Sequence, residues 1–188
     1  MKLDIAKAFD SVRWDYLLEV MQRMGFGTRW RAWVSALLAS ATSAVILNGV
    51  RGQWFDHRNG LRQGDPLSPM LFILAMEPLQ LMLNKAMEQN LLTEIGHRSA
   101  KLRISLYADD AAILVNPIKE EVAVIRDILQ GFGEASGLIT NTAKSAVYPI
   151  KCDGIQLHEV IEAFPCPINS FPCKYLGLPL HVRQLRRI

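Results

Sequence analysis

The chain alternates short apolar runs with longer stretches whose apolar residues recur at helical spacing. Short runs are typical of strands, and long amphipathic stretches are typical of helices. The expected strands lie at residues 3–6, 102–107 and 111–115, and the expected helices at 13–24, 28–40, 68–89 and 119–135. This order of elements predicts an α+β fold, in which helices pack on one face of a small antiparallel sheet. The order is a strand, helices, a hairpin and a further helix.

Turn and cap residues add detail to this pattern. Asn48-Gly49 lies between two apolar runs and predicts a β-hairpin. Gly25 is expected to end the first helix, and Thr28 to cap the second one. Near the C-terminus, the sequence predicts a strand at 147–150, a short helix at 155–164 and a tight hairpin at 174–180.

Two adjacent carboxylates, Asp109 and Asp110, lie where two of the predicted strands meet. Like charges side by side near an apolar core cost free energy unless a cation binds between them. A third carboxylate, Asp4, lies in the first predicted strand. Three carboxylates from two strands, with the backbone oxygen of Ile5 as a further ligand, suit a site for two Mg²⁺ ions that catalyses phosphoryl transfer. We expect Asp4 and Asp109 to bridge both ions, with Asp110 as a secondary ligand.

Each of these features also has a simpler interpretation. An Asp-Asp pair by itself is most often a solvated turn, and Asp4 by itself says little. Gly64-Asp65-Pro66 is ordinary turn chemistry. Only the combination of these features, in this order and spacing, favours a catalytic site over chance.

Composition narrows the class of protein only a little. The 188 residues fit one domain with a small appendage, and the mean hydropathy of +0.13 suggests that some apolar surface meets another segment. A net charge of +3 is compatible with nucleic-acid binding but does not require it. There is no glycine-rich phosphate loop, which argues against a P-loop or dinucleotide fold.

The cysteines and the apolar runs bear on the compartment. Cys152, Cys166 and Cys173 are odd in number and fit no zinc-binding spacing, so we expect reduced thiols in an intracellular protein. The N-terminus lacks a signal-peptide pattern, and the longest apolar run, 70–76, is too short to span a bilayer. We therefore expect no membrane partner.

Five segments of the chain resemble the motifs of one enzyme family. The sequences are LDIAKAFD at 3–10, LRQGDPLSP at 61–69, YADD at 107–110, GLITNTAKS at 137–145 and KYLGLPL at 174–180. In this order they are similar to motifs A to E of a reverse transcriptase, specifically of the LINE-type non-LTR retrotransposon class. The resemblance implies a polymerase palm at 1–180, with 11–58 partly fingers-like and 181–188 leading toward a thumb.

The resemblance also implies roles for individual residues. Asp4, Asp109 and Asp110 would bind two Mg²⁺ ions, or Mn²⁺, with the Ile5 backbone oxygen. Phe9 would exclude a 2′-hydroxyl and so select deoxynucleotides, although a core aromatic is an equally simple interpretation. The residues that would contact the incoming nucleotide are Phe9, Gln63, Gly64 and Lys144, and those near the template or primer are Arg62, Tyr107, Tyr175, Leu176 and Gly177.

Lys144 would act as a proton donor near the leaving pyrophosphate, although a lone lysine is more often a solvated charge. Ile139-Thr140 departs from the family's usual order of a polar and then an apolar residue. Such a one-residue change of phase moves a side chain to the opposite face of a strand. The position of Lys144 is therefore a specific question for the structure.

The implied partners are an RNA template, a DNA primer, deoxynucleoside triphosphates and a chain that supplies the fingers and thumb. Because these parts are expected to be missing, we expect little or no polymerisation by this chain alone. Two alternatives remain: a non-catalytic remnant of a decayed mobile element, and a nucleic-acid-binding module with Arg183, Arg186 and Arg187 as its basic cluster. An RNA-dependent RNA polymerase is a related enzymatic alternative, against which Phe9 and the YADD sequence argue only through the resemblance.

Overall fold

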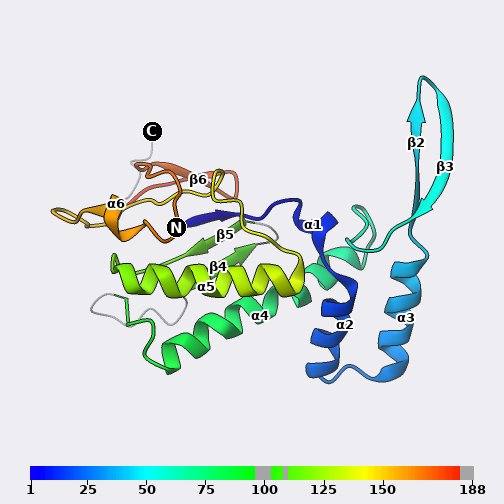
Figure 1. Ribbon diagram of the computed structural model, residues 1–188, viewed down its shortest axis with the longest axis horizontal. Helices are drawn as coiled ribbons and strands as arrows, with labels where there is room; N and C mark the ends of the chain where they lie inside the picture. The colour runs from blue at the N-terminus through cyan, green and yellow to red at the C-terminus, as the bar shows by residue number, and fades with distance from the viewer. Residues whose placement is uncertain (96–102, 108–109, 183–188) are drawn as a thin grey trace. The chain divides into compact units, whose positions relative to one another are not determined.

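The computed structural model describes residues 1–95, 103–107 and 110–182. The chain forms two compact units (Figure 1). The first, the sheet unit, comprises Met1–Ala6, Leu79–Gly131 and Ile139–Ile188, and the second, the hairpin unit, comprises Lys7–Pro78 and Phe132–Leu138. The positions of Arg183, Arg186 and Arg187 lie outside the described residues, so the predicted basic cluster stays a prediction.

A three-stranded antiparallel sheet forms the centre of the sheet unit. Its strands are β1 (Lys2–Asp4), β4 (Ile104–Tyr107) and β5 (Asp110–Ile113), in the spatial order β1-β5-β4. The predicted first strand is therefore confirmed, although it begins and ends earlier than expected. The predicted hairpin is confirmed as well, because Tyr107 pairs directly with Asp110.

The two faces of this sheet differ in polarity. Leu3 pairs with Ala111 and Ile104 pairs with Ile113, and all four side chains are buried. Side chains alternate between faces along a strand. Lys2, Asp4 and Asp110 therefore point away from this core, toward the other face of the sheet.

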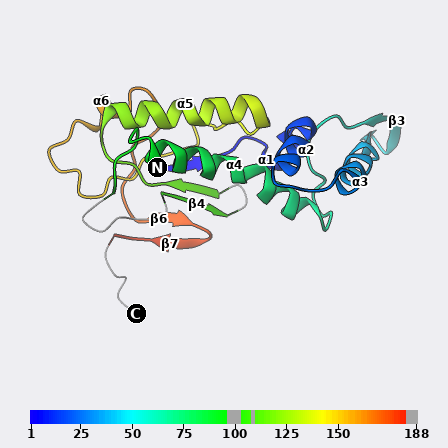
Figure 2. The ribbon, with the colours of Figure 1, turned by 90° about the horizontal axis from the view of Figure 1, so that it is seen from below.

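Two helices cover the apolar face of the sheet. Both α4 (Ser68–Glu88) and α5 (Lys119–Ser136) contribute part of their length to the sheet unit. Figure 2 shows these parts on one side of β4 and β5, with the hairpin of β6 and β7 on the other side. The helices bury Leu79, Leu83, Ala86, Val122, Ile125 and Leu129. This combination of helices and small antiparallel sheets confirms the predicted α+β class.

The C-terminal part of the sheet unit is less regular than expected. The tight hairpin is present as β6 (Cys173–Tyr175) and β7 (Leu178–Leu180). The expected strand at 147–150 is wrong, because Val147 makes only an isolated bridge with Ile168. The helix expected at 155–164 is reduced to α6 (Leu157–Val160).

A buried ion pair ties together three segments of the sheet unit. Arg103, just before β4, and Glu121, in the first turn of α5, are 2% and 3% exposed, and Arg103 Nη1 lies 3.3 Å from Glu121 Oε2. The backbone N–H of Thr93 donates to Glu121 Oε1 at 3.1 Å, and Arg103 also donates to the Thr93 carbonyl. Each buried charge is thereby compensated by a partner or a hydrogen bond.

The hairpin unit begins with three helices: α1 (Ala8–Ser11), α2 (Trp14–Arg23) and α3 (Thr28–Ala39). Gly25 has a φ of 87° and follows α2 as expected. The capping prediction is wrong, because Thr28 is the first helical residue and Gly27 holds the N-cap position.

The core of the hairpin unit combines these helices with the first part of α4. The buried apolar residues include Val12, Leu17, Met21, Val34, Leu38, Phe72, Ala75 and Phe132. Tyr16 packs edge-on against Phe132 and donates its hydroxyl to the Ala75 carbonyl at 3.0 Å. Burial raises the pKa of Tyr16, because the charged phenolate is poorly solvated there.

Strands β2 (Thr42–Leu47) and β3 (Val50–Asp56) form the predicted hairpin, in which Asn48 and Gly49 adopt φ angles of 50° and 80°. Its apolar side chains are widely exposed, for example 72% for Leu47 and 59% for Trp54. Exposed apolar patches of this kind are typical of interaction surfaces. No helix in the described part of the chain is long and apolar enough to cross a membrane.

Candidate active site

The sheet brings Asp4 and Asp110 together from sequence positions more than a hundred residues apart. They are direct partners in the antiparallel register of β1 and β5. Direct cross-strand partners have their Cβ atoms roughly 5 Å apart and project from the same face. The predicted proximity of Asp4 and Asp110 is thus confirmed, whereas Asp109 lies outside the described residues and its position stays a prediction.

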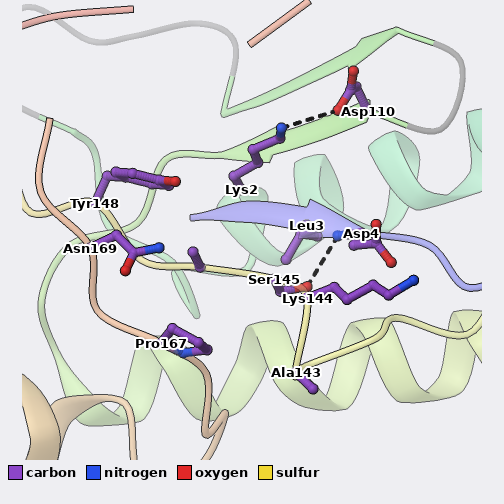
Figure 3. Close-up of a pocket in the computed structure, with 11 residues that line it drawn as sticks. Lys2, Leu3, Asp4, Asp110, Ala143, Lys144, Ser145, Tyr148, Pro167 and Asn169 are labelled. Carbon is purple, nitrogen blue, oxygen red and sulfur yellow. Dashed lines mark hydrogen bonds and ion pairs between the residues drawn. The ribbon is translucent and has the colours of Figure 1, made fainter. Parts of the chain in front are cut away.

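The backbone of Asp4 is held from both sides. On one side lies β5, and on the other side lies the segment from Asn141 to Ala146 (Figure 3). The Asp4 N–H donates to Ser145 Oγ at 3.1 Å, and the Asp4 carbonyl accepts the Asn141 N–H at 2.8 Å. Ser145 Oγ in turn donates to the Asn141 carbonyl at 2.8 Å. The side chain of Asp4 therefore starts from a rigidly placed backbone.

The Ile5 backbone lies in the same arrangement. An isolated antiparallel bridge joins Ile5 to Thr140. Two hydrogen bonds flank this bridge. The Asp4 carbonyl accepts the Asn141 N–H, and the Ala6 N–H donates to the Ile139 carbonyl at 2.9 Å. The carbonyl of Ile5 itself is not used by this bridge, which is consistent with its predicted role as a ligand.

A small polar cavity of about 230 Å³ adjoins the two acids. Figure 3 shows the residues that line it, which come from β1, β5, the 143–148 segment and the chain near Asn169. The charged members are Lys2, Asp4, Asp110 and Lys144. Lys144 therefore lines the same cavity as the two acids, despite the altered order of Ile139 and Thr140, and its role at the leaving pyrophosphate stays a prediction.

Lys2 is the cationic partner of Asp110. Its Nζ atom lies 3.5 Å from Asp110 Oδ1, with the two side chains 34% and 40% exposed. The same ammonium donates to the carbonyl of Lys174, in β6, at 3.1 Å. Sequence reasoning missed Lys2, although its position two residues before Asp4 on one strand places both side chains on the same face.

The predicted nucleotide-contacting residues Phe9, Gln63 and Gly64 belong to the hairpin unit. The half-buried ring of Phe9 stacks on Phe72, with centroids 4.6 Å apart and an interplanar angle of 12°. Gln63 and Gly64 are exposed, and Gly64 has a φ of 86°, a conformation that glycine adopts readily. The Phe9 carbonyl accepts the N–H of Leu61 at 2.6 Å, which joins the first motif to the second within this unit.

The residues predicted to contact template or primer occupy both units. Arg62 is exposed in the hairpin unit, and its carbonyl accepts the Ser68 hydroxyl at 2.6 Å. In the sheet unit, Tyr107 is 67% exposed at the end of β4, and the Tyr175 hydroxyl lies 3.0 Å from Ser105 Oγ.

The turn of the β6–β7 hairpin is formed by Leu176 and Gly177, with φ angles of 51° and 79°. Two residues with positive φ are typical of the tight turns that join antiparallel strands. The predicted primer-end loop is therefore a tight two-residue turn.

Among the described residues, no cluster of three or more aspartate, glutamate, histidine or cysteine side chains can hold a metal ion. Asp4 and Asp110 supply two hard carboxylate oxygen donors to one face of a sheet. Mg²⁺ is commonly bound in proteins by one or two carboxylates, with substrate phosphates and water as its other ligands. The donor set of the described residues thus fits Mg²⁺ in its chemistry.

The fold is mixed, with helices and small antiparallel sheets, and it pairs two acids on one face of its three-stranded sheet. The chain belongs to the reverse transcriptase family: the model of "Reverse transcriptase (RNA-dependent DNA polymerase)" matches residues 1–180. This match confirms the resemblance seen in the five motifs.

Individual relatives point to mobile elements. The chain is 32% identical over 146 residues, 78% of its length, to the "Transposon TX1 uncharacterized 149 kDa protein" of Xenopus laevis. It is 28% identical over 187 residues, 94% of its length, to the retrovirus-related Pol polyprotein from type-2 retrotransposable element R2DM of Drosophila melanogaster. A Pol polyprotein from type-1 retrotransposable element R2 of Popillia japonica is 30% identical over 114 residues, 61% of the chain.

These relatives confirm the non-LTR retrotransposon class of reverse transcriptase. The chain spans 11%, 17% and 18% of the lengths of the Xenopus, Drosophila and Popillia proteins, respectively.

Proposed function

We propose that this chain is the palm of an RNA-directed DNA polymerase, which extends a DNA primer on an RNA template. The observation that carries the proposal is the direct pairing of Asp4 with Asp110, inside two motifs that the family model matches. Directly opposed like charges destabilise a sheet unless a cation compensates them. A catalytic site that binds cations accounts for this pairing, because the bound cations compensate the two like charges.

In this proposal Asp4, Asp110 and Asp109 hold two divalent ions, Mg²⁺ or Mn²⁺, with help from the Ile5 carbonyl. Divalent ions held there would supply the charge that makes the 3′-hydroxyl of the primer nucleophilic and neutralises the leaving pyrophosphate. The protein contributes mainly position and charge, because phosphoryl transfer requires little covalent chemistry from side chains. Lys144, which lines the same cavity, donates a proton to the leaving group.

The remaining roles follow from the motifs. Phe9 selects deoxynucleotides by excluding a 2′-hydroxyl, while Gln63 and Gly64 contact the nucleotide and template. Stacking on Phe72 supports this role, because it fixes the plane of the Phe9 ring. The primer and template contacts are assigned to Arg62, Tyr107, Tyr175, Leu176 and Gly177.

The domain assignment is part of the same proposal. Residues 1–180 form the palm, 11–58 include part of the fingers, and 181–188 lead toward a thumb. The exposed apolar side chains of β2 and β3 support the idea that a further protein segment, or a partner chain, packs on the fingers-like part.

Metal binding tests the proposed site directly. We expect the 188-residue chain to bind Mn²⁺ in isothermal titration calorimetry, and Asp4→Ala to lose most of this binding because one carboxylate ligand disappears. Asp153→Ala is a matched control, since Asp153 does not line the cavity. Binding that is equal in Asp4→Ala and wild type would contradict the proposed site and favour a non-catalytic remnant or a simple nucleic-acid-binding module.

A further inference from the structure

We infer that Lys2 is a positioning residue of the metal site, whose ammonium group acts as a resident cation on Asp110 and competes with the divalent ions for it. The inference rests on the proposed function, because it concerns the same carboxylates. It adds a residue outside the acids and assigns it a measurable effect on metal affinity.

The strand register explains how Lys2 reaches Asp110. Lys2 on β1 lies directly opposite Ala112 on β5. The Asp4–Asp110 pair lies two residues further along the strands, and so on the same face of the sheet. Diagonal neighbours on one face of a sheet lie within reach of a long side chain. Because Ala112 is small, the lysine can extend over it, and its Nζ atom comes to lie 3.5 Å from Asp110 Oδ1 (Figure 3).

The charges on this face explain why a cation belongs there. Asp4 and Asp110 are opposed like charges, and Lys2 supplies a compensating positive charge on the same side of the sheet. Lys144 is the other cation among the described residues that line the cavity. Lys2 can therefore offset the negative charge of Asp110 in the absence of metal, which weakens its repulsion with Asp4.

The second contact of Lys2 fixes the position of its ammonium. The Lys174 carbonyl, in β6, accepts a hydrogen bond from Nζ at 3.1 Å. An ammonium held by two groups from different strands is more restricted than a solvated lysine. The β6–β7 hairpin thus helps to keep the cation beside Asp110.

A divalent ion that uses Asp110 has to displace this ammonium or bind against its repulsion. Removing the positive charge should therefore strengthen metal binding. A unit charge several ångströms from a divalent ion in a partly solvated site changes affinity by on the order of tenfold. An ordinary surface ion pair, in contrast, contributes little and would leave metal affinity unchanged when broken.

The test compares Mn²⁺ binding by the wild-type chain, Lys2→Met and Lys2→Arg, with free Mn²⁺ followed by electron paramagnetic resonance. We expect Lys2→Met to tighten binding by about tenfold at low salt, because the competing charge is gone. Lys2→Arg should stay within about twofold of wild type, since it keeps the charge. The gain in Lys2→Met should shrink as salt is added, because salt screens charge.

The matched control is Lys119→Met. Lys119 belongs to the same unit and also forms an ion pair, with Glu162 at 2.6 Å, but it does not line the cavity. Its loss should leave Mn²⁺ affinity unchanged. Lys2→Gln provides a second neutral variant in case Lys2→Met does not fold.

Three outcomes would overturn the inference. If both neutral Lys2 variants bind Mn²⁺ no more tightly than wild type, Lys2 does not compete with the metal ion. In that case the proposed function still holds as long as Mn²⁺ binding by the wild-type chain depends on Asp4. An equal gain in Lys119→Met would show only a general effect of net charge. The absence of Mn²⁺ binding in wild type and in all Lys2 variants would overturn the proposed metal site together with the role of Lys2.

Discussion

At the scale of single residues, Gly60 lies just before the second motif and approaches the backbone at the end of the first motif closely. It adopts a φ of 83°, and a Cβ atom added there would lie 2.7 Å from the backbone oxygen of Asp10. Its N–H donates to the Val12 carbonyl at 2.7 Å. The position therefore requires glycine both for its backbone conformation and for the close approach of another backbone segment.

We predict that Gly60→Ala destabilises the protein by about 2–4 kcal/mol, because the new methyl group forces the backbone to move in addition to the conformational cost. The measurement is the midpoint of urea unfolding. Gly25→Ala is the control, since Gly25 also has a positive φ of 87° but has open space around its Cβ position. It should cost only about 1 kcal/mol, and equal losses in the two variants would refute the role of close approach.

The residues of the candidate site were predictable from the sequence to different extents. Asp4 could be associated in advance with the adjacent acids Asp109 and Asp110 because both segments lie in recognisable motifs, but the sequence favoured Asp109 over Asp110 as the partner and did not place Asp110 within a strand. Lys2 was missed, because its importance depends on the register of β1 against β5, which places it diagonally from Asp110. The sequence shows that Lys2 and Asp4 share a face but does not show which strand lies beside them.

At the scale of secondary-structure elements, the buried pair of Arg103 and Glu121 holds β4, α5 and the segment after α4 together. Asn116 adds a further link, donating its side-chain N–H to Thr93 Oγ1 at 2.8 Å and to Glu121 Oε1 at 3.3 Å. Burying a pair of charges gains stability only when hydrogen bonds satisfy both partners. The stability of β4, and of Tyr107 at its end, thus depends on polar contacts remote from the site.

We predict that Glu121→Gln destabilises the fold by about 3–5 kcal/mol, because it leaves the Arg103 guanidinium buried without a counter-charge. Thermal or urea unfolding measures the loss. Glu162→Gln, which removes the exposed ion pair with Lys119, should cost less than about 1 kcal/mol. If Glu121→Gln were as mild as Glu162→Gln, burial of the pair would have no energetic consequence.

Elements that depend on local interactions along the chain were predicted correctly, whereas an element that depends on a distant partner was not. The β2–β3 and β6–β7 hairpins were predictable because a local turn at Asn48-Gly49 or Leu176-Gly177 determines them. The strand expected at 147–150 is absent because a strand requires a neighbour, and Val147 finds only a single bridging partner, Ile168. That partner lies in an irregular segment, and no local pattern indicates its position.

At the scale of the whole molecule, the proposed machinery is distributed over two compact units. The acids, Lys2 and Lys144 belong to the sheet unit, whereas Phe9, Gln63 and Gly64 belong to the hairpin unit. In the proposed function, metal binding uses residues of the sheet unit, whereas nucleotide selection is assigned to residues of the hairpin unit. The two properties can be measured separately, which allows the site to be tested without polymerase activity.

Polymerisation requires a template, a primer and a nucleotide to be held in one geometry, and a small misplacement reduces the rate strongly. The chain spans at most 18% of the three relatives described above, which carry much more protein than this chain. We therefore predict little or no primer extension by the 188-residue chain with Mg²⁺, an RNA template and deoxynucleotides, even where Mn²⁺ binding is intact. Robust extension that Asp109→Asn abolishes would contradict this prediction and show that the palm alone positions its substrates.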